Sequence, residues 1–133
     1  MKKLIFIVLC LVPLLAACSD TPPSSAIGKQ VAASVKNDDL YTVVDVEKTN
    51  GRKVDDNNYL AAVTYKLKFK TSYQALVNEV QQEEARNPLS AFGDAAGLSM
   101  LQTKFGAFKK GDIKSVKAEF HFVKTEKGWI LDK

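Results

Sequence analysis

Residues 59–69 constrain the fold most, because their odd-numbered positions form one apolar face. These positions are Tyr59, Ala61, Val63, Tyr65, Leu67 and Phe69, and the opposite face carries Thr64, Lys66, Lys68 and Lys70. A repeat of two residues is typical of a β-strand, in which successive side chains point to opposite sides of a sheet. The chain must therefore contain a sheet with one buried face, and other segments must supply neighbouring strands and a cover.

Four strands are predicted, in two pairs. The first pair joins a segment starting at Tyr41, where Thr42, Val44 and Val46 share a face, to residues 59–69. Asn50-Gly51 is a strong turn signal between them, and residues 55–58, Asp-Asp-Asn-Asn, are a second polar turn. The second pair is separated by a turn at 125–128 and ends in Trp129-Ile130-Leu131. Its first strand places Val116, Ala118, Phe120 and Phe122 on one face.

Three helices are predicted from spacings of three and four residues. Residues 26–37 carry an apolar stripe of Ile27, Val31 and Val35, with Ser24 or Ser25 as the cap. A second helix, 71–86, opens with the capping-box spacing of Thr71 and Gln74 and stops at Asn87-Pro88. The third helix presents the stripe Leu98, Leu101, Phe105 and Phe108, and Lys109-Lys110-Gly111 would end it.

The order of these elements predicts an α+β fold. A four-stranded antiparallel sheet would pack against the N-terminal helix and against a helical insertion between the two strand pairs. We expect one domain over 26–133, a length that suits a single core, preceded by a flexible tether at 18–25.

Residues 1–17 are predicted to be a cleaved signal peptide. A basic start, Met1-Lys2-Lys3, is followed by fourteen uncharged residues, 4–17, that end in small side chains. As a helix those fourteen residues would span about 21 Å, less than the hydrocarbon core of about 30 Å. Pro13 would interrupt such a helix as well.

The end of this segment, Leu15-Ala16-Ala17-Cys18, resembles the lipobox of bacterial lipoprotein precursors. The resemblance implies that the Cys18 thiol receives a diacylglyceryl group and that signal peptidase, recognising Leu15, Ala16 and Ala17, cuts before it. Further acylation, for example by palmitate, would complete a stable membrane anchor. Ser19 rather than Asp follows the cysteine, which by the same resemblance favours the outer membrane, facing the periplasm.

Composition excludes several classes of function. Removal of residues 1–17 would lower the net charge from +4 to +2, which gives no reason to expect a nucleic-acid partner. Cys10 would leave with the signal peptide and Cys18 would be acylated, so no cysteine remains for a disulfide, a nucleophile or a metal site. We expect no cofactor and no metal.

Four groups of residues are candidates for chemical sites. His121, the single histidine, lies on the polar strand face with Glu119, where no nucleophile is evident. The acidic turn 55–58 lacks the bidentate glutamate that a calcium loop needs. Glu79, Glu83, Glu84 and Asp94 have no apolar pocket to favour glycosidase chemistry, and Lys66, Lys68, Lys70 and Lys117 suggest a solvated face or a shallow patch for acidic groups. We therefore expect no catalysis.

Residues 26–70 and 112–133, the latter ending in a Gly-Trp hairpin, resemble small cystatin-like or nuclear-transport-factor-like envelope lipoproteins. The favoured interpretation is a lipid-anchored accessory or binding module with a protein partner in the envelope. The stripe Leu98, Leu101, Phe105 and Phe108 would then be a partner surface or cover the sheet. One alternative is a carrier of a small apolar ligand, in which helix 92–108 closes a cavity lined by Val63, Tyr65, Leu67 and Phe120. Another is an immunity or inhibitor protein that inserts loop 50–58 into a toxin or hydrolase.

Overall fold

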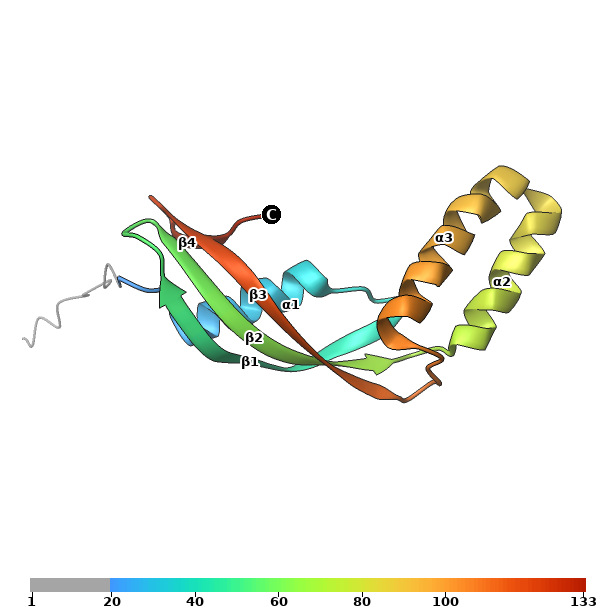
Figure 1. Cartoon of the computed structure of the whole chain (residues 1–133), viewed down its shortest axis with the longest axis horizontal. Coiled ribbons are helices and arrows are strands. Elements are labelled where there is room, and N and C mark those ends of the chain that lie inside the picture. Colours follow the sequence, from blue (N-terminus) through green and yellow to red (C-terminus); the bar gives the residue numbers. More distant parts are fainter. Residues whose placement is uncertain (1–19) are drawn as a thin grey trace, which may run out of the picture.

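The computed structural model describes residues 20–133. The predicted signal peptide and lipidation site, including Leu15, Ala16, Ala17 and Cys18, lie outside the described residues. The elements follow the order α1 (Ser24–Val35), β1 (Tyr41–Lys53), β2 (Asn58–Phe69), α2 (Tyr73–Arg86), α3 (Pro88–Phe105), β3 (Ile113–Thr125) and β4 (Gly128–Leu131). They form one antiparallel sheet of order β1-β2-β3-β4 and three helices (Figure 1), which confirms the predicted α+β fold.

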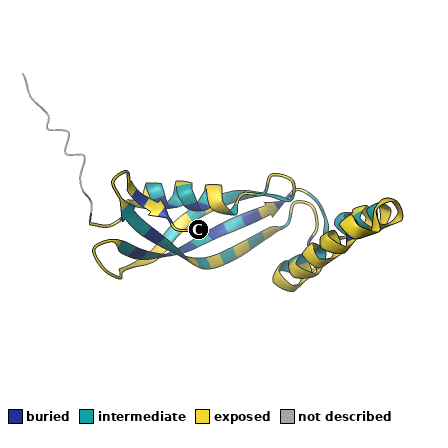
Figure 2. Cartoon of the chain, turned by 90° about the horizontal axis from the view of Figure 1, so that it is seen from above, coloured by how far each residue is buried: buried dark blue, intermediate teal, exposed yellow. Residues whose placement is uncertain are grey.

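Helix α1 lies along one face of the sheet and contacts both β1 and β4 (Figures 1 and 2). Its Ile27 and Val31 are fully buried, as their spacing predicts. The side-chain amide of Gln30 donates to the Trp129 carbonyl at 2.9 Å and accepts from the Leu131 N–H at 2.7 Å. These two hydrogen bonds join α1 to the backbone of β4.

The start of the domain differs from the prediction. Ser24 and Ser25 belong to α1 instead of the tether, and Pro22 is fully buried. Neither serine caps the helix, because the N-cap residue is Pro23, whose carbonyl accepts from Ala26 and Ile27.

Strand β2 is the centre of the core. All six of its predicted inward residues are buried, with exposures of 5% or less. They join α1, β4 and three aromatic residues of the helical insertion in one cluster of buried and half-buried side chains. This cluster draws on residues from Ile27 to Leu131, so the described chain has a core of its own.

Strand β1 breaks the predicted alternation. The β1–β2 register shifts between Val44 and Glu47, where Asp45 adopts a left-handed φ of 52°. Asp tolerates this region better than most residues. The resulting bulge places Tyr41, Val43 and Val46 against the core.

The predicted turn at Asn50-Gly51 is wrong. Strand β1 continues to Lys53, and the chain turns at the polar residues 54–57. Gly51 pairs with Ala61, and a Cβ there would overlap the side chain of Tyr59. Gly51 is therefore needed because its missing side chain leaves space for the Tyr59 ring, and it does not form a turn.

Helices α2 and α3 form an antiparallel hairpin that extends beyond the end of the sheet (Figure 1). Ser72, and not Thr71 as predicted, caps α2 by accepting from the Ala75 N–H at 3.1 Å. Asn87 ends α2 and caps α3, and Pro88 occupies the first turn of α3, as the Asn-Pro signal indicates. Helix α3 is therefore adjacent to α2 with no intervening loop.

The base of the hairpin packs on the end of the sheet through Phe108. The predictions that Phe108 lies on the α3 stripe and that the helix ends at 109–111 are wrong, because α3 ends at Phe105 and is capped by Gly106, whose φ is 69°. Phe108 lies in the following loop and stacks on Phe69, with ring centroids 3.9 Å apart. The Tyr73 N–H donates to the Phe108 carbonyl at 3.0 Å, so the loop also holds the start of α2.

Candidate functional site

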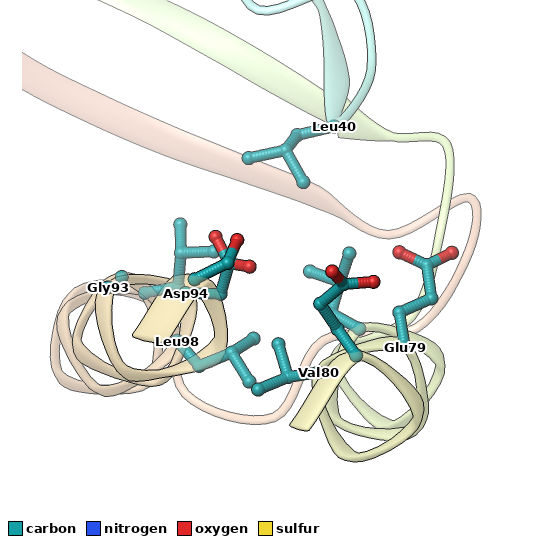
Figure 3. A pocket seen from close by; sticks show the side chains of 11 residues that line it. Leu40, Glu79, Val80, Gly93, Asp94 and Leu98 are labelled. Atoms are coloured by element: carbon teal, nitrogen blue, oxygen red, sulfur yellow. The ribbon is translucent and has the colours of Figure 1, made fainter. Parts of the chain in front are cut away.

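A trough runs between the hairpin and the end of the sheet. Its outer part has a volume of about 600 Å³ and lies between Leu40, which precedes β1, and the facing sides of α2 and α3 (Figure 3). Apolar side chains line it from both helices: Leu76 and Val80 from α2, Leu98 and Leu101 from α3. Leu40 faces them from the other side (Figure 3).

The inner part of the trough has a volume of about 840 Å³ and lies between the end of α1, strand β2 and α3. It shares Leu40, Gly97 and Leu101 with the outer part, so the two parts are continuous. Tyr65 and Leu67 of β2 and Phe105 of α3 belong to its aromatic and aliphatic lining. Ser34, Ser99 and Thr103 supply hydroxyls, and Lys36 and Lys104 supply positive charge.

Two tyrosines, Tyr41 and Tyr65, line the inner part of the trough. The Tyr41 hydroxyl donates to the Val35 carbonyl at 2.8 Å and so ties β1 to the end of α1. Burial raises the pKa of both Tyr41 and Tyr65, so both phenols are neutral hydrogen-bonding groups at physiological pH.

The acidic residues weighed for catalysis divide between trough and solvent. Glu79 and Glu83 of α2 and Asp94 of α3 line the outer part, and Figure 3 shows Glu79 and Asp94 on the side facing Leu40. None of these three forms an ion pair with a described residue. Glu84 does not line the trough.

Helix α3 also exposes an apolar stripe, of which Met100 borders the inner part of the trough. Leu89, Phe92 and Met100 are 86%, 78% and 74% exposed, respectively. Leu89, Phe92, Ala96 and Met100 follow spacings of three and four, so they share one helix face. We call this face the outer stripe. Helix α3 is therefore apolar both on the side that packs against α2 and on the outer stripe, which α2 does not cover.

The predicted site residues separate into two places. Leu98, Leu101 and Phe105 are half-buried along the trough, whereas Phe108 is buried in the core. Of the four residues expected to line a closed carrier cavity, Val63, Tyr65 and Leu67 are buried at 5% exposure or less and Phe120 is half-buried against the same core. Tyr65 and Leu67 also line the inner part of the trough, so the space beside these two residues is open to one side instead of closed by helix 92–108.

His121 bonds both of its ring nitrogens to neighbours. Nε2 is 2.8 Å from Asn58 Oδ1, and Nδ1 is 3.1 Å from Asp132 Oδ2. The expected companion Glu119 is not among its partners. Neither Asn58 nor Asp132 is a nucleophile that the imidazole would activate, and the arrangement links β2, β3 and the chain end.

The acidic turn 55–58 is closed by its own hydrogen bonds. Both carboxylate oxygens of Asp55 accept from the Asn58 side-chain amide at 2.9 Å, and Oδ1 also accepts from the Asn57 N–H. These bonds lower the pKa of Asp55, and a hydrogen bond from Lys53 lowers that of Asp56. Within residues 20–133 no group of three or more histidine, cysteine or acidic side chains is arranged to hold a metal ion. The loop proposed for insertion into an enzyme shortens to 54–57, because residues 50–53 belong to β1.

The predicted lysine face is partly neutralised. Lys66 forms a 2.9 Å ion pair with Asp45 of the bulge, and Lys70 donates to the Asp38 carbonyl at 2.6 Å. Lys68 and Lys117 lie on the same outer face of the sheet. A patch of four unengaged cations is therefore absent from this part of the described chain.

Leu40 and the two parts of the trough were not predictable from local sequence patterns. Leu40 stands alone in a polar segment, so no periodicity marks it, and its partners come from the distant hairpin. Gly93 and Gly97 are a local indication of the trough in the sequence, since both line its outer part.

No family model, curated protein or solved structure shows significant similarity to this chain. The lipobox and the cystatin-like resemblance therefore stay predictions. None of the helices within residues 20–133 has the length and apolarity that a membrane crossing requires.

Proposed function

We propose that this protein is a lipid-anchored envelope lipoprotein that acts as a non-enzymatic binding module in the periplasm, attached to the outer membrane through Cys18. One observation carries the proposal: the hairpin extends from the sheet with an apolar outer stripe that no described residue covers. Single exposed apolar residues are ordinary, but Leu89, Phe92 and Met100 form one contiguous face.

The position of the hairpin supports this function. Asp20, the first described residue, lies near the β1–β2 turn, at the opposite end of the long axis from the hairpin (Figure 1). An anchor two residues before Asp20 would hold that end at the membrane. The hairpin would then point into the periplasm, where a partner protein could reach it.

The packing favours a protein partner over a small apolar ligand. A carrier needs an enclosed space, yet the sheet core is filled and the trough is open on its outer side. Half-buried Leu98 and Phe105 instead offer apolar surface that a second protein would cover.

Affinity capture from detergent-solubilised envelopes tests the proposal. We expect the wild-type protein to retain a stoichiometric partner and the Leu89→Ser/Phe92→Ser variant to lose it. Val54→Ser/Ile130→Ser is the matched control, because these residues are 52% and 41% exposed but lie in the β1–β2 turn and in β4, away from the hairpin. Recovery of lipid alone, or equal loss in both variants, would contradict the proposal.

A further inference from the structure

The hairpin has almost no core of its own. Helix α2 contains no buried residue, and Ala91 is the single buried residue of α3. Helices of 14 and 18 residues are marginal in water without packing, because most helical stability in proteins comes from a covered apolar face. Leu76, Val80, Leu98 and Leu101 face the trough and stay partly exposed. Helices α2 and α3 share an apolar groove, and no other helix or strand of the described residues covers it.

Two glycines widen this groove. Each glycine inside a helix costs about 1 kcal/mol relative to alanine. A Cβ at Gly93 or Gly97 would meet no atom within 4 Å, so packing within the chain does not require either residue. Both line the trough, and both leave space where a side chain would otherwise narrow it.

The rim of the outer part is negatively charged. Glu79 and Glu83 contribute from one helix and Asp94 from the other, and none has an ion-pair partner among the described residues. No lysine or arginine lines this part of the trough. An apolar groove with an acidic rim is complementary to a segment that carries apolar residues on one side and basic residues beside them.

We propose that the outer part of the trough binds a basic amphipathic helix of the partner protein, which completes a three-helix layer with α2 and α3. The inference rests on the proposed binding function and specifies the partner's chemistry. Apolar side chains of the partner helix lie over Leu76, Val80 and Leu98, its backbone approaches Gly93 and Gly97, and its lysines or arginines pair with the three acids.

The test uses residues 20–133, which contain their own core, and an 18-residue fluorescent peptide of leucine and lysine at helical spacing. Fluorescence anisotropy reports binding. We expect Gly97→Leu to weaken binding at least about tenfold by filling the groove, as loss of an interface anchor does. Ala95→Leu, a similar enlargement at an exposed α3 residue that neither lines the trough nor belongs to the outer stripe, is expected to change binding less than about twofold. Circular dichroism should show that both variants are folded, since leucine favours helix more than glycine does and nearly as much as alanine does.

Charge is tested separately. We expect the variant Glu79→Gln/Glu83→Gln/Asp94→Asn to weaken peptide binding about fivefold or more and to remove most of its salt dependence. The control Glu84→Gln/Glu119→Gln/Glu126→Gln changes the net charge equally without touching the trough. A leucine–glutamate peptide should bind far more weakly than the leucine–lysine peptide.

Several results would overturn the inference: no binding of the basic peptide, equal binding of the acidic peptide, or equal effects of Gly97→Leu and Ala95→Leu. A concentration-dependent dimer that Gly97→Leu dissociates would overturn it as well, because a second copy would then occupy the groove. If the envelope partner is lost in Leu89→Ser/Phe92→Ser but retained in Gly97→Leu, the binding module stands and the trough inference fails.

Discussion

Single residues in this protein have roles that depend on their neighbours across the sheet. Gly51 is the clearest case, because the Tyr59 side chain occupies the space that a Cβ would need. The two residues are diagonal neighbours on one face, since Tyr59 pairs with Lys53 and Gly51 with Ala61. Lys48 completes the arrangement with its ammonium 5.1 Å from the Tyr59 ring centroid.

Gly51→Ala should therefore destabilise the domain, by about 1–3 kcal/mol, as over-packing does in other cores. The free energy of unfolding from urea denaturation measures the effect. Asn50→Ala is the control, because Asn50 is exposed and bonds just to the adjacent N–H. If the dipeptide were a turn, the two substitutions would have comparable effects.

The acidic turn supplies a pH-dependent contribution to stability. Hydrogen bonds from Asn58 and Asn57 lower the pKa of Asp55 in the folded protein relative to its ordinary value. Stabilisation by the ionised carboxylate is thus complete above the ordinary aspartate pKa and is lost as the pH falls through the lowered one. NMR titration should show Asp55 protonating at lower pH than a free aspartate. Asn58→Ala should raise that pKa and Asn78→Ala, on α2, should not.

At the scale of elements, secondary structure was predicted correctly where apolar residues repeat regularly along the segment. It was predicted wrongly where a contact with a residue distant in sequence determines the conformation. Strand β2 was predicted correctly because its six inward residues repeat every second position and all are buried. The Asn50-Gly51 signal was misleading because Tyr59 requires that glycine for space. Phe108 continued the spacing of α3, and nothing in that spacing showed that the helix ends at Gly106 or that the ring stacks on Phe69.

The same limit applies to the candidate site. Leu98, Leu101 and Phe105 were identified from their helical stripe, and they do line the trough. Its opposite wall, including Leu40, is brought there by the tertiary fold and has no local pattern. Fold class was therefore predictable from periodicity, whereas the shape of the trough was not.

The hairpin is attached to the sheet mainly at its base, and Phe108 is the main link. Phe108→Ala should cost about 3–5 kcal/mol, as truncation of a buried phenylalanine does. Phe92→Ala on the outer stripe should have little effect on the free energy of unfolding, because Phe92 is 78% exposed. Similar losses for both phenylalanines would contradict this account of how the hairpin is held.

Hydrogen-exchange rates should differ between the hairpin and the sheet. We expect backbone amides of α2 and α3 to exchange much faster than those of β2, because the hairpin has so few buried residues. Addition of the leucine–lysine peptide should slow exchange in both helices and leave β2 unchanged. Equal protection of hairpin and sheet in the unbound protein would show that the hairpin needs no further cover.

At the scale of the whole molecule, the long axis separates the predicted anchor from the hairpin. The 12-residue strand β2 alone spans about 40 Å. The β1–β2 turn lies at the end of the axis where the described chain begins, and the hairpin lies at the other end (Figure 1). If Cys18 carries the lipid, the molecule stands with the turn near the membrane and the hairpin away from it.

This orientation can be measured with the mature lipoprotein in vesicles that contain an acceptor-labelled lipid. Asp56→Cys in the β1–β2 turn and Leu89→Cys at the tip of the hairpin introduce exposed thiols, and the acylated mature chain offers no other free thiol. A donor dye at position 56 should transfer energy to the lipid acceptors more efficiently than a dye at position 89. In the chain with Cys18→Ser the difference should vanish, because that protein should no longer stay on the vesicles. Equal transfer from both positions would mean that the hairpin lies along the membrane, and its outer stripe would then contact lipid instead of a protein.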